Sequence, residues 1–213
     1  MDILLAVLDV VLHLDKHLLI LAQDYGTWIY LILFLIIFCE TGLVVTPFLP
    51  GDSLLFVTGA LAATGALAPE NVVLLLTAAS ILGDNTNYWV GRYFGPKMFK
   101  SEHSRLLNPR YLEQTHQFYQ RHGGKTIILA RFFPIIRTFA PFVAGVGKMD
   151  YRQFVPYSLI GGLAWVGSLV LAGYFFGNIP YIKQNLTLVI FGIVGISLLP
   201  GVIGFIRHRY AKS

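Results

Sequence analysis

Two long stretches near the end of the chain, residues 153–182 and 184–206, contain no Asp, Glu, Lys or Arg. At a rise of 1.5 Å per residue, about 20 residues cross the hydrocarbon core of a bilayer, so each stretch is long enough for a transmembrane helix. A third stretch, 25–39, is also free of charge and very apolar. The predicted spans are 26–45, 71–91, 153–176 and 185–206.

The composition agrees with a membrane protein. Apolar residues make up 55% of the 213 residues and charged residues only 13%, whereas soluble domains carry about 25% charged residues. This balance argues against a soluble enzyme, and an aromatic content of 14% argues against disorder. The single cysteine, Cys39, excludes an internal disulfide and a cysteine-cluster metal site. We therefore expect no metal, no cofactor and no enzymatic activity.

The distribution of basic residues predicts the topology. The net charge is +5, and in a membrane chain an excess of Lys and Arg indicates the cytoplasmic side rather than nucleic-acid binding. The segment 92–125 holds seven Lys or Arg and two Asp or Glu, and it contains a predicted short helix at 109–122. We expect this segment and the tail 207–213 to be cytoplasmic. Residues 2–20 carry a polar stripe with a spacing of seven, which predicts an amphipathic helix lying in the membrane interface.

The two predicted spans 153–176 and 185–206 bring the chain back to the side from which it started, so residue 147 and the tail lie on the same side. If 92–125 also lies on that side, the segment 126–147 must enter the membrane and return on the same side. Two arginines, two prolines and two glycines in this segment suit a re-entrant hairpin buried in protein better than a helix facing lipid. The segment 46–64 is similar, and it is re-entrant from the opposite side if the N-terminus is cytoplasmic. We favour that arrangement. The alternative places the N-terminus outside, with three full crossings before residue 92.

Short sequence similarities between the two halves suggest an inverted repeat. The segment 47–51 resembles 141–145, and 91–95 resembles 173–177. Transporters use opposed broken segments that meet near the midplane around a substrate site, although two membrane-like halves could share such short strings by chance. The predicted fold is an all-α integral membrane domain with four spans and two opposed re-entrant hairpins. Its parts are an interfacial helix (1–24), a first repeat (25–91), a cytoplasmic basic segment (92–125), a second repeat (126–206) and a cytoplasmic tail (207–213).

Five ionisable residues lie in otherwise apolar segments: Glu40, Asp52, Asp84, Arg131 and Arg137. Such residues are costly within a membrane and face protein or a water-filled cavity. One interpretation is structural ion pairing that holds the hairpins together. The other is a polar cavity that binds a charged group and moves protons, because the guanidinium fork suits phosphate and a carboxylate in a low dielectric can hold a proton near physiological pH.

Several blocks of the sequence carry a family resemblance. The long block 131–145 (RFFPIIRTFAPFVAG) and the shorter blocks 40–42, 47–53 and 83–88 resemble the signature of the DedA family of bacterial inner-membrane proteins. The resemblance extends over residues 25–180. It implies relationship to eukaryotic lipid scramblases and the movement of polyisoprenyl phosphates or phospholipids across the membrane, driven by protons. It also implies that Glu40 and Asp52 form a functional acidic pair and that Arg131 and Arg137 form a functional basic pair.

We therefore predict a proton-coupled flippase for a lipid phosphate, such as undecaprenyl phosphate, in the bacterial inner membrane. Arg131 and Arg137 would bind the phosphate, and Glu40 and Asp52 would carry protons. The expected partners are membrane lipids and protons, with no nucleic acid, and a homo-oligomer is compatible with the sequence. An ion or small-cation antiporter and a non-catalytic membrane organiser remain alternatives. Predicted supporting residues are Asp84, Pro47, Pro50, Gly51, Pro134, Pro141 and Gly145.

Overall fold

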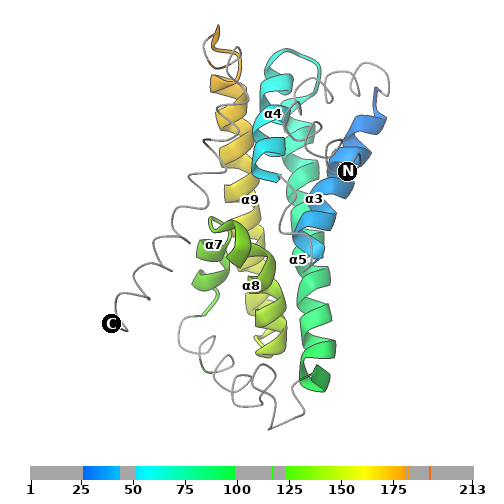
Figure 1. Cartoon of the computed structure of the whole chain (residues 1–213), viewed down its shortest axis with the longest axis vertical. Helices are drawn as coiled ribbons and strands as arrows, with labels where there is room; N and C mark the ends of the chain where they lie inside the picture. The colour runs from blue at the N-terminus through cyan, green and yellow to red at the C-terminus, as the bar shows by residue number, and fades with distance from the viewer. Residues whose placement is uncertain are drawn as a thin grey trace, which may run out of the picture. The chain divides into compact units, whose positions relative to one another are not determined.

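The computed structural model describes residues 26–43, 51–98 and 123–180, with the single positions 117, 182 and 192. The elements within these ranges are all helices, as predicted, and the described residues form no strand. The helices are α3 (Trp28–Gly42), α4 (Gly51–Ala63), α5 (Pro69–Met98), α7 (Lys125–Ala130), α8 (Pro134–Val146) and α9 (Tyr151–Phe176) (Figure 1). Several predicted parts lie outside the described residues, apart from positions 117 and 192: the interfacial helix, the helix at 109–122, the span at 185–206, the tail, Pro47 and Pro50.

Three of the predicted spans correspond to helices. Among the described residues, α9 is the one helix long and apolar enough to cross a bilayer by length and composition. The helix α3 is apolar but has 15 residues and ends at Gly42, before the predicted boundary at 45. The helix α5 has 30 residues, and it is less apolar because it carries charged side chains, among them Glu70, Asp84 and Arg92.

The predicted hairpin segment 126–147 contains two short helices with a break between them. The helix α7 ends at Ala130, and α8 begins at Pro134 and packs against α7. Phe133 is extended, with φ −117° and ψ 108°, because the residue before a proline is disfavoured in the helical region. Pro134 then occupies the first turn of α8, where a proline needs no amide hydrogen. The sequence therefore interrupts the helix between Ala130 and Pro134.

The chain divides into two compact units. Unit 1 takes the described residues within Met1–Ile36, Leu49–Leu76 and Val166–Ser213, and unit 2 takes those within Ile37–Phe48 and Thr77–Trp165. The helices α3, α5 and α9 each contribute one part to each unit.

In unit 1, α4 packs closely against the C-terminal part of α9 through glycines. A Cβ atom on Gly59 would overlap the backbone carbonyl of Val170, and one on Gly173 would overlap the carbonyl of Phe56. The side-chain amide of Asn178 also donates to the carbonyl oxygen of Ala60, at 3.2 Å. Any larger residue at these glycines would force the two helices apart.

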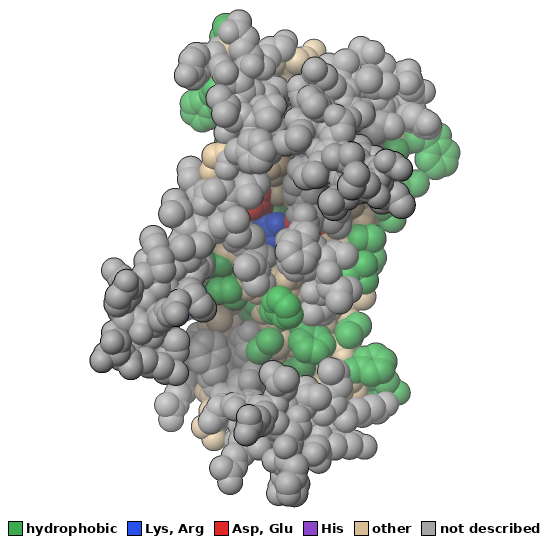
Figure 2. All heavy atoms as spheres, in the orientation of Figure 1, with side chains coloured by type: hydrophobic (Ala, Val, Ile, Leu, Met, Phe, Trp, Pro, Cys, Tyr) green, Lys and Arg blue, Asp and Glu red, His purple; other side chains and the backbone are tan. Residues whose placement is uncertain are grey.

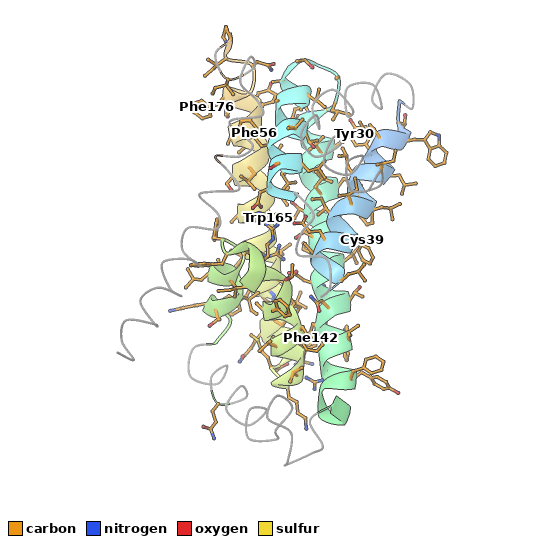
Figure 3. The ribbon with its side chains drawn as sticks, in the orientation of Figure 1. Tyr30, Cys39, Phe56, Phe142, Trp165 and Phe176 are labelled. Atoms are coloured by element: carbon orange, nitrogen blue, oxygen red, sulfur yellow. The ribbon has the colours of Figure 1, made fainter. Side chains whose placement is uncertain are left out.

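In unit 2, α8 packs in the same way against the C-terminal part of α5. A Cβ atom on Gly145 would overlap the carbonyl of Tyr88, and one on Gly91 would overlap the carbonyl of Phe142. Figure 3 shows Phe142 on α8, beside α5. Tyr88 stacks on Phe154 with ring centroids 4.5 Å apart, in a buried cluster. The buried members of this cluster are Tyr88, Ile127, Ala130, Ala140, Ala144, Met149 and Phe154.

The two glycine contacts share one register. Gly59 faces the residues three before and one after Gly173, and Gly145 faces the residues three before and one after Gly91. The similarity between 91–95 and 173–177 therefore corresponds to equivalent packing. The contacts match Gly145 with Gly59, whereas the similarity between 47–51 and 141–145 pairs Gly145 with Gly51. Close backbone contact, rather than the shared proline pattern, defines the equivalent positions.

Candidate functional site

Within unit 2, one face of α5 carries a row of buried polar side chains. Thr77, Ser80, Asp84 and Asn87 are all buried, and their spacing of three, four and three residues places them on one face of the helix. Of these, only Asp84 was singled out from the sequence. Helical spacing of small polar residues around Asp84 is the signal that could have identified the other three.

The first ion pair of the site joins α5 to the break between α7 and α8. The guanidinium Nη2 of Arg131 pairs with Oδ2 of Asp84, and both side chains are buried. Nη1 of Arg131 donates to the hydroxyl of Ser80 at 2.5 Å, and the Ser158 hydroxyl on α9 donates to Oδ2 of Asp84 at 2.6 Å. Hydrogen bonds from neutral neighbours thus complete the pair, as a buried ion pair requires.

Two glycines of α9 make room for this arginine. A Cβ atom on Gly161 would lie 3.0 Å from Cδ and 3.2 Å from Nε of Arg131, and one on Gly162 would lie 3.5 Å from Nη2. The Arg131 side chain therefore lies directly along the backbone of α9. Its Nε atom is buried without a hydrogen-bond partner among the described residues.

The second ion pair joins α3 to α8. Nη2 of Arg137 pairs with Oε1 of Glu40, whose exposed fraction is 0%. Cζ of Arg137 lies 4.5 Å from the centroid of the Trp165 ring, which α9 contributes (Figure 3). The guanidinium therefore contacts a carboxylate and also lies over an aromatic ring, whose face attracts a cation by its quadrupole.

Asn87 connects the backbone segments that carry the second pair. Its Nδ2 donates to the carbonyl of Thr41 at 3.2 Å and to the carbonyl of Thr138 at 2.6 Å. These are the residues that follow Glu40 and Arg137. Oδ1 of Asn87 is buried and has no hydrogen-bond partner among the described residues. Asn87 therefore fixes α3 and α8 to α5 at the position of the pair.

The two ion pairs form one electrostatic site. Arg137 acts electrostatically on both Asp84 and Arg131, so the two pairs are close neighbours. Two guanidinium groups and two carboxylates balance in charge. On the face shown in Figure 2, the acidic and basic side chains that are coloured gather at one place, whereas green hydrophobic side chains are widespread. Within the described ranges, no three His, Cys, Asp or Glu residues are placed to hold a metal ion.

The structure brings together four of the five intramembrane charges predicted from the sequence: Glu40, Asp84, Arg131 and Arg137. Asp52 lies in unit 1, where it is buried in the first turn of α4. Among the described residues, the acidic partner of Arg131 is Asp84, for which the sequence predicts a supporting role. Ser80, Asn87, Ser158 and Trp165 were missed, because the contacts that define them link segments far apart in the sequence.

The predicted supporting residues on α4 and α8 lie at the starts of the two helices, inside α8 and in a close helix contact. Gly51 is the buried first residue of α4, and Pro134 starts α8. Pro141 lies inside α8, and Gly145 forms the close contact with α5.

A helical protein with paired charges in apolar segments is typical of an integral membrane protein, and comparison with known proteins supports this class. The VTT domain matches residues 49–175. Protein DedA of Escherichia coli K12 is 58% identical over 215 residues, which cover all of this chain and 98% of the relative. An uncharacterized membrane protein of Mycobacterium tuberculosis H37Rv is 44% identical over 181 residues, covering 84% of this chain and 79% of the relative. The inner membrane protein YqjA of Escherichia coli K12 is 32% identical over 194 residues, covering 82% of this chain and 88% of the relative.

The chain therefore belongs to the DedA family of membrane proteins, which carry the VTT domain. No solved structure matches it.

Proposed function

We propose that the protein is a proton-coupled flippase that moves a lipid phosphate across the bacterial inner membrane. The observation that carries this proposal is the pair of buried arginines, Arg131 and Arg137, each held by a buried carboxylate in an apolar helical unit. A guanidinium offers a planar fork of donors that suits phosphate as well as carboxylate. A phosphate head group could therefore replace a carboxylate at the same donors.

The coupling follows from competition for the Arg137 guanidinium. When Glu40 is ionised, it occupies that guanidinium. When Glu40 takes up a proton, its attraction for the cation falls and the phosphate can bind. Release of the proton on the other side restores the ion pair and expels the phosphate, while the hydrocarbon tail stays in the lipid. Asp52 would serve as the second proton carrier.

The proposed path requires two opposed re-entrant hairpins. Support comes from the break between α7 and α8 and from the shared glycine register, in which Gly59 corresponds to Gly145. Helix pairs with the same contacts in both units are expected from an inverted repeat.

The topology can be tested with cysteines introduced at Ser101 and Ser213, after removal of Cys39. We expect both cysteines to resist an impermeant thiol reagent in intact cells and to react after permeabilisation, because both would be cytoplasmic. Labelling of one but not the other in intact cells would contradict the second hairpin.

The function can be tested by reconstitution into liposomes with an assay of head-group accessibility. A polyprenyl phosphate should cross faster in the presence of the protein, and a pH gradient should increase its rate. The uncharged polyprenol, which has the same tail, should cross at the protein-free rate. Equal movement of all lipids without any response to pH would reject a proton-coupled lipid-phosphate flippase.

A second candidate is a non-catalytic membrane organiser. It is favoured by the observation that each arginine already has an acidic partner, so the charges could serve only to hold the helices. Joint replacement of Glu40 by Gln and Arg137 by Met separates the two functions. An organiser should tolerate this neutral pair in cells, whereas a flippase should lose transport completely.

A further inference from the structure

The two buried arginines of unit 2 lie in different surroundings. Both terminal nitrogens of Arg131 have described partners, because Nη1 donates to Ser80 and Nη2 contacts Asp84 and Ser158. Its other neighbours are the two glycines of α9. Arg131 is thus held by polar groups that come from two helices, α5 and α9.

Arg137 instead lies against an aromatic ring. Its Cζ is 4.5 Å from the centroid of Trp165, which is 2% exposed, so the contact is shielded from water. This contact and the ion pair with Glu40 are present together in the structure. The ring and an anion can therefore hold the same guanidinium at the same time.

The Trp165 ring also differs from Glu40 because it does not take up or release a proton. If Glu40 is neutralised, the attraction between the Trp165 ring and the cation remains, and it is largest where water is excluded. The position of the guanidinium over the ring would therefore be kept after the carboxylate loses its charge. A ligand that arrives at that moment meets a preorganised fork, which lowers the cost of binding.

We propose, on the basis of the function proposed above, that Trp165 is a positioning residue that makes Arg137 the arginine that binds the head group. The ligand class is a phosphate monoester on a lipid, bound by the Arg137 guanidinium while it stays in contact with the Trp165 ring. Arg131, held by Asp84 and the two serines, supports the site without exchanging partners.

The first test is transport kinetics in proteoliposomes with a polyprenyl phosphate as substrate. Trp165→Leu should raise KM by about tenfold or more and change kcat by less than about threefold, because it removes a contact that acts mainly in binding. Trp165→Phe keeps an aromatic face and should stay within about threefold of the wild-type KM. Trp89→Leu is the matched control, because Trp89 lies in the same unit, is 51% exposed and touches none of the four charges.

A purely structural role for Trp165 would give a different pattern. A misfolded fraction lowers the number of active molecules, so kcat would fall and KM would stay unchanged. That pattern in Trp165→Leu, or a KM equal to that of Trp89→Leu, would overturn the proposal.

The second test measures binding without transport. The chain has three tryptophans, so Trp28→Phe combined with Trp89→Phe leaves Trp165 as the only indole. Titration of this variant in detergent with a polyprenyl phosphate should change the emission of Trp165 in a saturable way, and polyprenol should not. Adding Arg137→Gln should abolish the response, and adding Arg131→Gln should preserve it in the folded fraction.

The two tests separate the inference from the function on which it rests. A saturable response without lipid movement would reject the flippase and keep Trp165 and Arg137 as the phosphate site. Lipid movement without a response would keep the flippase and overturn the role of Trp165. Loss of the response in Arg131→Gln but not in Arg137→Gln would reverse the assignment of the arginines and overturn it as well.

Discussion

Replacement of Asp84 by Asn tests whether the Asp84–Arg131 pair is a permanent structural connection. Oδ2 of Asp84 accepts from Nη2 of Arg131 and from the hydroxyl of Ser158, and all three side chains are buried. The amide is nearly the same size but has no charge, so Arg131 would remain buried without its counter-ion. Breaking a buried pair in this way typically costs about 3–5 kcal/mol. For a chain of 213 residues this corresponds to a fall in melting temperature of roughly 6–20 °C.

The assay is thermal unfolding in detergent, with Glu70→Gln as control because Glu70 is an exposed carboxylate on the same helix. The control should change the free energy of unfolding by less than about 0.5 kcal/mol. Combining Asp84→Asn with Arg131→Met should recover much of the loss, because the uncompensated charge is then gone. A melting temperature within 2–3 °C of wild type for Asp84→Asn, together with loss of pH-dependent transport, would refute this reasoning and make Asp84 a proton carrier.

Three further sets of substitutions test other parts of the structure. Arg137→Lys should fold normally but lose most transport, because an ammonium group lacks the planar fork of donors. Arg131→Lys should also show impaired transport. Normal transport rates in both variants would reject recognition of the phosphate by a guanidinium fork. Glu40→Gln should keep a melting temperature within a few degrees of wild type while transport loses its response to a pH gradient, because the protein must already tolerate a neutral Glu40 in each cycle. Gly145→Ala should lower stability by about 1–3 kcal/mol in thermal unfolding, because its Cβ overlaps the backbone of α5, whereas Gly167→Ala, with no atom within 4 Å of its Cβ, should not.

The helical content and the charged residues of the site could be predicted from the sequence. Charge-free runs locate α9, and the proline at 134 marks the break before α8. Charges are so rare in apolar segments that Glu40, Arg131 and Arg137 stand out without any structure.

The pairing of these charges could not be predicted. Arg131 pairs with Asp84, and Ser80 and Ser158 supply further hydrogen bonds to this pair. Those two serines are ordinary residues in the sequence, and only the three-dimensional arrangement makes them part of the site. Asp84 lies in α5 and Arg131 after α7, so neither periodicity nor local motifs relate them.

The register of the two halves was also beyond the sequence. Short apolar strings matched Gly51 with Gly145, whereas the packing matches Gly59 with Gly145. The role of a glycine in a close helix contact depends on which backbone segment packs against it. The sequence around the glycine does not show which segment that is. The role of Trp165 is hidden for the same reason, since a tryptophan in an apolar helix normally indicates packing.

The most direct measurement of the central claim is proton movement that accompanies lipid phosphate. Proteoliposomes with a pH-sensitive dye inside, and with no imposed pH gradient, would receive a polyprenyl phosphate in the outer leaflet. The account predicts a change in internal pH that requires the protein, is absent with polyprenol and is absent with Glu40→Gln. Translocation of the phosphate at the full rate with no proton movement, or with equal proton movement in Glu40→Gln, would contradict it.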